Sequence, residues 1–189
     1  MNFAEAPTLT TSRLRLRGWR ETDLAPFAAL NADPAVVEFL PKPLTRDESD
    51  LMVERIQDGF AQRGFGLWAV EVVDSGAFAG FVGLGVPRFD APFTPCVEIA
   101  WRLGPAHWGH GYATEAASAA LDFGFREQGL NEIVSFTVPA NLKSRAVMDR
   151  LGMQHDPAED FDHPLLPEGH RLRRHVLYRL PAVPAEHRR

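Results

Sequence analysis

The residues best suited to chemistry gather around one glycine-rich segment, Trp108-Gly109-His110-Gly111-Tyr112-Ala113. This segment directly precedes Thr114, where a helical pattern begins, so unpaired backbone N–H groups at the helix start would converge on one spot. Glycines permit positive φ and let a ligand approach the main chain. Such a turn favours an anion, for example a phosphate. It can equally be a purely structural connection between a strand and a helix, and from these residues alone both interpretations stay open.

A carboxylate precedes this turn. Glu98 lies in residues 96–103, CVEIAWRL, whose β-branched and aromatic content is typical of a strand that ends where the glycines begin. A carboxylate in that position can serve as a general base, either through a water molecule or with a pKa raised by burial. The alternative is that Glu98 pairs with an arginine on the surface of the sheet.

Two other sets of side chains invite chemical interpretations. The single cysteine, Cys96, has no histidine beside it in its strand, so we expect a buried structural thiol and not a nucleophile. Histidines and aspartates are frequent in the segment that follows residue 152, but without the short, regular spacing of metal ligands. We therefore expect no metal, and a loop that faces the substrate is the more plausible role of His155, Asp160, Asp162, His163, His170 and His175.

The elements that must position these residues follow from hydrophobic periodicity and capping signals. We expect Thr22 to cap a short helix, Asp33-Pro34 to open another, and Thr45 with Glu48 to form a capping box. The predicted strands span residues 13–17, 66–73, 78–86, 96–103, 132–138 and 173–180. The predicted helices span residues 22–30, 33–40, 46–62, 114–128 and 142–151, the last capped by Asn141 and followed by Gly152.

Length and composition restrict the class of protein. A chain of 189 residues predicts one domain, with a core over about residues 8–180 and a loose tail over 181–189. The net charge of -5 argues against a nucleic-acid partner, since such proteins need a basic face. Charges, Pro or Gly interrupt every apolar run, so we expect no membrane partner. One cysteine and a start without a signal-peptide pattern fit a reducing cytoplasm.

Three stretches together resemble a known family. Residues 98–115, EIAWRLGPAHWGHGYATE, are similar to the signature of the GNAT N-acetyltransferases, in particular the RimJ/RimL branch that acetylates ribosomal-protein N-termini. Residues 9–17 (L-x-T-x-R-L-x-L-R) resemble the first strand of that branch, and residues 141–153 (N-x-x-S-x-x-V-x-x-x-L-G-M) resemble its second motif. The resemblance covers about residues 8–180.

The resemblance implies an α+β (mixed α/β) fold. Its central sheet would be twisted and mostly antiparallel, with about six or seven strands that splay apart between the fourth and fifth and about four flanking helices. Acetyl-CoA would lie in the opening as co-substrate. The residues implied to bind it are Ala100, Trp101, Arg102, Leu103, Trp108, Gly109, His110, Gly111, Tyr112, Ala113, Thr114 and Asn141. Residues 109–114 would hold the pyrophosphate, residues 100–103 would pair with the pantetheine arm, and Asn141 would contact that arm.

The sequence departs from the family pattern at two positions. Trp108 stands where the wider family has Gln or Arg, which leaves binding by the main chain intact. Met148 stands where many members carry a tyrosine that protonates the departing thiolate. The resemblance therefore suggests Glu98 as the base and Ser144 as a substitute acid. A serine there can also simply bond to the helix backbone. Lys143 and Arg145 either reach an outer phosphate or form a solvated helix face.

The expected function is transfer of acetyl from acetyl-CoA to a primary amine, by direct attack in a ternary complex. The amine would be a protein N-terminus or a small molecule, and the helices between Thr22 and Gln62 would form one wall of the acceptor groove. The alternative is a non-catalytic acyl-CoA-binding sensor of the same fold. A Rossmann-type nucleotide site is disfavoured, because the glycine turn follows a fourth strand. A homodimer is the commonest assembly, but no residue pattern predicts one.

Overall fold

The computed structural model describes residue 3 and residues 5–183. Its α-helices are α1 (Glu21–Ala32), α2 (Pro34–Val37), α3 (Arg46–Arg63), α4 (Tyr112–Arg126) and α5 (Leu142–Arg150). Its strands are β1 (Leu9–Thr10), β2 (Leu14–Arg17), β3 (Leu67–Val72), β4 (Phe78–Gly85), β5 (Glu98–Leu103), β6 (Glu132–Thr137), β7 (Gln154–His155), β8 (Phe161–Asp162) and β9 (Arg174–Pro181). Two short 3-10 helices, Pro105–His107 and Pro157–Glu159, complete the elements.

The strands form one mixed sheet in the order β1-β2-β3-β4-β5-β6-β9-β7, with β8 paired to β9. Neighbouring strands are antiparallel except β5 and β6, which run parallel and are in register only at Glu98 and Val134. The predicted fold and the splay between the fourth and fifth long strands are thus confirmed. In the described residues the sheet has nine strands instead of the expected six or seven, because three strands of two residues each, β1, β7 and β8, were not predicted.

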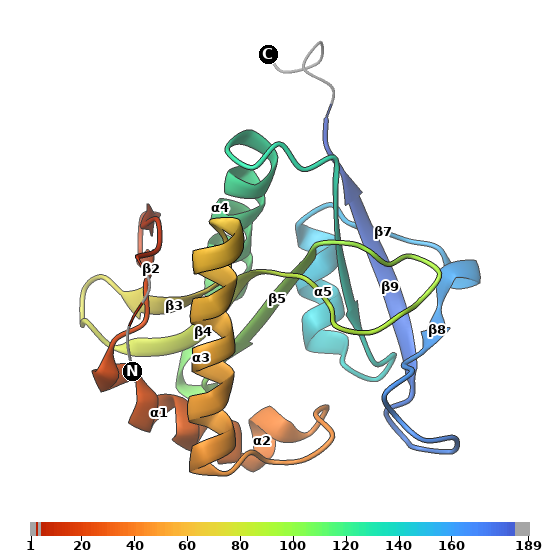
Figure 1. Cartoon of the computed structure of the whole chain (residues 1–189), viewed down its shortest axis with the longest axis horizontal. Helices are drawn as coiled ribbons and strands as arrows, with labels where there is room; N and C mark the ends of the chain where they lie inside the picture. The colour runs from red at the N-terminus through yellow and green to blue at the C-terminus, as the bar shows by residue number, and fades with distance from the viewer. Residues whose placement is uncertain (1–2, 4, 184–189) are drawn as a thin grey trace.

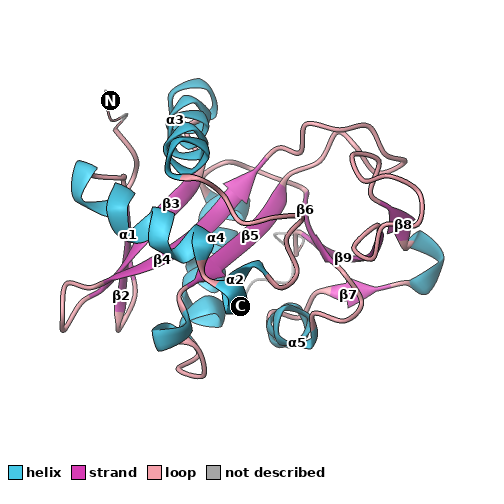
Figure 2. Ribbon diagram, turned by 90° about the horizontal axis from the view of Figure 1, so that it is seen from below, coloured by secondary structure: helices cyan, strands magenta, loops and turns pink. Residues whose placement is uncertain are grey.

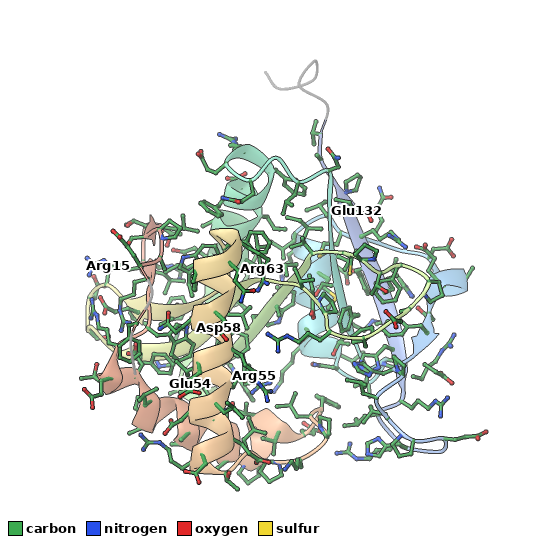
Figure 3. All side chains as sticks on the ribbon, viewed as in Figure 1. Arg15, Glu54, Arg55, Asp58, Arg63 and Glu132 are labelled. Atoms are coloured by element: carbon green, nitrogen blue, oxygen red, sulfur yellow. The ribbon has the colours of Figure 1, made fainter. Side chains whose placement is uncertain are left out.

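The first half of the sheet carries most of the hydrophobic core. Helix α4 packs against β4 and β5, and α1 packs against α3 and β4. In Figure 1 these elements lie on one side of the molecule, and β9 with α5 lies on the other. Trp68 of β3, Phe27 of α1 and Ile99 of β5 are completely buried. The charged side chains of Glu54, Arg55 and Asp58 lie along α3 (Figure 3).

Local capping explains where several helices begin and end. The Thr45 hydroxyl accepts a hydrogen bond from the Glu48 N–H at 3.2 Å, and the Glu48 carboxylate accepts from the Thr45 N–H at 2.9 Å, so the predicted capping box is confirmed. The predicted cap at Thr22 is wrong. The N-cap of α1 is Arg20, two residues before Thr22, and the Asp23 carboxylate accepts from the Arg20 N–H at 2.8 Å. The bond that stabilises this helix start is thus from the N-cap N–H to a carboxylate in the first turn, and not from a first-turn N–H to a cap hydroxyl.

The second half of the sheet is built on the antiparallel pair β6 and β9, and α5 contacts β6 and α4. Figure 2 shows α3 above and α5 below the strands in that view. Strand β9 extends to Pro181, which pairs with Glu132, so the predicted tail begins one residue too early. Residues 184–189 of that tail lie outside the described residues. Among the described residues, no helix is long and apolar enough to cross a membrane.

Candidate active site

A cavity of about 1380 Å³ opens where β5 and β6 diverge. Strand β5, the glycine turn, the start of α4, the end of β6 and one face of α5 line it. The sequence-predicted residues on its wall are Glu98, Ala100, Trp101, Arg102, Leu103, Trp108, Gly109, Gly111, Tyr112, Ala113, Thr114, Asn141 and Ser144. His110 is the one predicted site residue that is not on the wall. It is exposed and stacks on Tyr112, with ring centroids 5.4 Å apart.

The glycine turn presents the start of α4 to this cavity. Gly109 and Gly111 have φ of 76° and 78°, the left-handed region in which a β-carbon is strained. The main chain can therefore turn sharply into Tyr112, the first residue of α4. The Glu115 N–H bonds to the Gly111 carbonyl at 3.0 Å, so the N–H groups of residues 112–114 precede the first bond within the helix. These donors and the positive end of the helix suit an anion.

Residues 11–13, immediately before β2, form a clamp on the turn that the sequence did not reveal. Arg13 Nη1 donates to the His110 carbonyl at 2.9 Å, and Arg13 Nη2 lies 2.6 Å from Glu115 Oε2. Glu115 also accepts from the Thr11 hydroxyl at 2.6 Å, and the guanidinium lies 4.9 Å from the Tyr112 ring centroid. The conformation of the turn is thus tied to the chain at residues 11–13. The sequence held one indication of this contact, since Arg13 and Glu115 belong to two of the stretches that resemble the GNAT family.

Trp108 connects the turn to β5. Its Nε1 donates to the Leu103 carbonyl at 2.7 Å, and Lys143 Nζ lies 4.2 Å from its ring centroid. The tryptophan therefore braces the turn and holds a cation at the cavity wall. Arg145 is not on the wall, and its Nε instead donates to the Tyr178 hydroxyl at 3.3 Å.

Of residues 100–103, which were predicted to pair with the pantetheine arm, only some direct their main-chain groups to the free edge of β5. The Ile99 and Leu103 carbonyls accept from Ser135 and Trp108, on the side away from β4. In an antiparallel strand, alternate residues point their main-chain groups to opposite neighbours. Trp101 therefore points to the same side as Ile99 and Leu103, where β6 has already diverged. Ala100 and Arg102 direct their main-chain groups to β4.

Glu98, the first residue of β5, lies at the closed end of the splay, where β5 is in register with β6. Glu98 is partly exposed, and it lines the cavity. Burial raises the pKa of its carboxyl group to about 8, since a charge there loses hydration. Within the described part of the chain no arginine or lysine forms an ion pair with it. The surface ion pair considered as an alternative is therefore not found.

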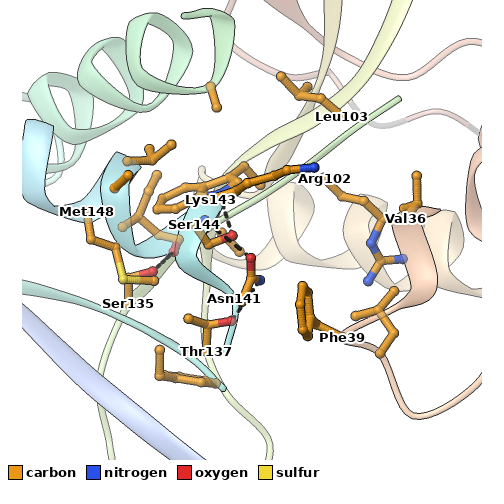
Figure 4. A pocket seen from close by; sticks show the side chains of 18 of the residues that line it. Val36, Phe39, Arg102, Leu103, Ser135, Thr137, Asn141, Lys143, Ser144 and Met148 are labelled. Atoms are coloured by element: carbon orange, nitrogen blue, oxygen red, sulfur yellow. Dashed lines mark hydrogen bonds between the residues drawn. The ribbon is translucent and has the colours of Figure 1, made fainter. Parts of the chain in front are cut away.

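The N-terminus of α5 brings three polar groups to the opposite wall (Figure 4). The Asn141 Oδ1 accepts from the Ser144 N–H at 3.3 Å, and its Nδ2 donates to Thr137 Oγ1 at 3.0 Å, so the amide caps the helix. The Ser144 hydroxyl accepts from the Trp101 indole at 3.3 Å. Met148, one turn further along, is 1% exposed and lines the cavity, so a thioether lies where the resemblance implies a tyrosine in many family members.

The cysteine and the histidines take mostly structural positions. Burial, followed by the charge of Glu98, raises the pKa of the Cys96 thiol to about 11, which keeps it protonated at neutral pH. His155 bonds to Asp160 at 2.7 Å and stacks on Tyr178. His163 and His175 have ring centroids 5.1 Å apart and line the cavity. Among the described residues no group of three or more His, Cys, Asp or Glu is placed to hold a metal ion.

The remaining wall of the cavity is mostly apolar. Helix α2 and the segment after it contribute Val36, Phe39 and Leu40, and the loop before β9 contributes Leu165 and Leu172. Of the helices expected to form an acceptor wall, only α2 and the residues that follow it line the cavity.

Comparison with known proteins gives consistent matches over most of the chain. Residues 13–154 match the family described as the acetyltransferase (GNAT) domain. The chain is 33% identical over 148 residues to protein YkkB of Bacillus subtilis strain 168, covering 78% of this chain and 85% of YkkB. It is 32% identical over 162 residues to the FsC-acetyl coenzyme A-N(2)-transacetylase of Aspergillus fumigatus, covering 82% and 68% of the two chains.

A solved structure of RimJ from Mycobacterium smegmatis in complex with CoA-disulfide superposes with a TM-score of 0.75. The two chains are 21% identical, and the match covers 96% of this chain and 90% of RimJ. At that identity the likeness concerns the fold.

Proposed function

This chain belongs to the GNAT acetyltransferase family, and we propose that it transfers the acetyl group of acetyl-CoA to a primary amine, by direct attack within a ternary complex. The observation that carries this proposal is Glu98. An unpaired carboxylate with a pKa raised to about 8 lines the same cavity as an anion-binding helix start. We propose that the whole chain acts as one catalytic domain.

The residues of the cavity fit acetyl-CoA. The N–H groups of residues 112–114 would hold the pyrophosphate, and Lys143 adds a cation beside them. The main chain of Trp101, on the free edge of β5, would pair with the pantetheine arm. Bound there, acetyl-CoA supplies an acetyl group activated as a thioester. The name of the Aspergillus relative, which pairs acetyl coenzyme A with N(2) transacetylation, supports this donor and a nitrogen acceptor.

Glu98 would take the proton that the amine loses as its nitrogen bonds to the acetyl carbon. An efficient general base has a pKa near the operating pH, so that it is partly ionised and still basic. Burial provides this for Glu98, whose carboxyl group would otherwise be a weak base near pKa 4.5. Because the carboxylate has no cationic partner among the described residues, none of its basicity is lost to an ion pair.

Ser144 would donate a proton to the sulfur as it leaves. Its oxygen accepts from the Trp101 indole, so its own hydroxyl hydrogen stays free to point into the cavity. The buried Met148 has no proton to give. Nothing in the geometry favours the sensor alternative specifically, and that alternative becomes an outcome of the test below.

The test is calorimetric titration with acetyl-CoA, followed by a thiol-release assay over N-terminal peptides and small amines. Gly111→Trp places a bulky side chain in the turn and should abolish acetyl-CoA binding. Gly76→Trp is the matched control, because Gly76 also has positive φ (69°) but does not line the cavity. Binding with thiol release for one class of amine supports the proposal. Binding without turnover on any amine supports a sensor, and unimpaired binding by Gly111→Trp contradicts the assignment of the turn.

A further inference from the structure

Arg102 is a charged side chain that the proposed chemistry does not use. It extends from β5 toward Val36 of α2 and Phe39 of the segment after it (Figure 4), and it lines the cavity. Its Nη1 donates to Asn31 Oδ1 at 2.6 Å, and its guanidinium carbon lies 5.4 Å from the Phe81 ring centroid. Within the described residues these contacts include no carboxylate, and Nε and Nη2 have no protein acceptor.

Arg17, the arginine that the described part of the chain buries most completely, shows how a guanidinium can be compensated within the fold. It is 5% exposed and bonds to Asp23 at 2.7 Å and to Glu71 at 2.8 Å. A buried charge is costly unless it is paired. Arg102, which is only partly exposed, has instead a neutral amide and an aromatic ring, so an anion that compensates its charge would come from outside the chain.

The Asn31 contact holds the guanidinium ready for such an anion. Asn31 is completely buried, and its Nδ2 donates to the Ser49 hydroxyl at 2.8 Å, which fixes the amide with its oxygen toward Arg102. One edge of the guanidinium is thereby anchored. The other edge keeps its donors in the fork geometry that matches a carboxylate.

Arg102 and Glu98 lie on the same face of β5, four residues and roughly 13 Å apart along the strand. Burial alone shifts the pKa of each group, lowering that of Arg102 to about 10 and raising that of Glu98 to about 8, so neither charge compensates the other. Arg102 remains protonated at neutral pH. An anion bound to it is therefore separated by several bonds from an amine positioned at Glu98.

We propose that Arg102 selects acceptors by pairing with a carboxylate that the acceptor carries several bonds away from its reacting amine. This inference rests on the proposed acetyl transfer and names the substrate class for the same site. The apolar wall formed by Phe39, Leu40, Leu165 and Leu172 would contact the portion between the two groups. The carboxylate can belong to a short peptide or to a small amino acid with a long spacer, because the shared chemistry is the same.

The test compares acceptors that differ only in the carboxylate. Ala-Phe with Ala-Phe amide forms the peptide pair, and 6-aminohexanoate with 6-aminohexanamide forms the small-molecule pair. We expect the acid of at least one pair to have a kcat/KM about 10- to 100-fold above that of its amide, as for a charge-assisted hydrogen bond. In Arg102→Gln this ratio should fall to about 1, through loss on the acid, with the kcat/KM of the amide within about threefold of wild type.

Two results overturn the inference: no preference for the acid in either pair, or a preference that persists in Arg102→Gln. Arg102→Met, which keeps the apolar contact with Phe81, replaces the Gln variant if that variant does not fold. If no acceptor is acetylated, the proposed function fails on its own. In that case calorimetry measures the affinity of the same acid and amide pairs for the protein in complex with CoA. Tighter binding of the acid that is lost in Arg102→Gln supports the inference, and equal binding of acid and amide contradicts it.

Discussion

At the scale of single residues, β5 carries two ionisable groups, Glu98 and Arg102, that have no counter-charge among the described residues, and both line the cavity. By contrast, the buried Arg17 is paired with Asp23 and Glu71. Perturbed groups that gather in one cavity are typical of functional sites. In our proposal Glu98 contacts the reacting amine of the acceptor, and Arg102 pairs with the carboxylate of the acceptor.

Ser144 is expected to contribute to kcat. Ser144→Ala removes the hydroxyl proton that would neutralise the departing thiolate, and we expect kcat to fall about 10- to 100-fold. Steady-state thiol release at saturating acetyl-CoA measures this change. Ser135→Ala is the matched control, because Ser135 also lines the cavity but its hydroxyl bonds to the Ile99 carbonyl at 3.0 Å. Equal kcat values for Ser144→Ala and wild type would assign protonation of the sulfur to solvent.

At the scale of elements, the site depends on how the turn after β5 is held. The strand, the glycine turn and α4 are adjacent in sequence, but the clamp that fixes them comes from residues 11–13. Trp108 adds a second brace through the Leu103 carbonyl. The main chain that faces the proposed pyrophosphate is therefore preorganised by contacts from two directions.

Arg13→Gln should weaken acetyl-CoA binding without unfolding the protein. The substitution removes the contacts to His110 and Glu115, so ordering the turn on binding would add a cost, and we expect the Kd to rise about tenfold. Isothermal titration calorimetry measures it. Arg46→Gln, which removes an exposed ion pair with Asp50 on α3, should leave the Kd unchanged. A Kd for Arg13→Gln equal to that of wild type would remove the clamp from the account.

Elements with strong local signals were predictable from the sequence. The Thr45 and Glu48 capping box and the left-handed Gly64 set the ends of α3 through contacts within a few residues. Strands β1, β7 and β8 were missed, because two-residue strands exist only through their partners. The roles proposed for Arg13 and Arg102 depend on distant chain segments, residues 110–115 and Asn31, so their positions alone could not reveal them.

At the scale of the whole molecule, the divergence of β5 and β6 creates the cavity and also isolates Glu98. The sign of the resulting stability effect follows from linkage. The folded-state pKa is raised above the ordinary 4.5, so the unfolded chain releases its proton first, and stability falls as pH rises from about 4.5 to 8. The same burial that makes the carboxylate a useful base therefore lowers the free energy of unfolding at neutral pH.

The most direct test of the central claim is the pH profile of kcat/KM for wild type and Glu98→Gln. The acceptor should have an amine whose own pKa lies well away from 8. Because a base acts when deprotonated, wild-type activity should rise with pH through an apparent pKa near 8. Glu98→Gln should lose about 100-fold in kcat/KM and lack that inflection, with acetyl-CoA affinity unchanged. A variant that keeps both the wild-type rate and the inflection would contradict the assignment of Glu98 as the base.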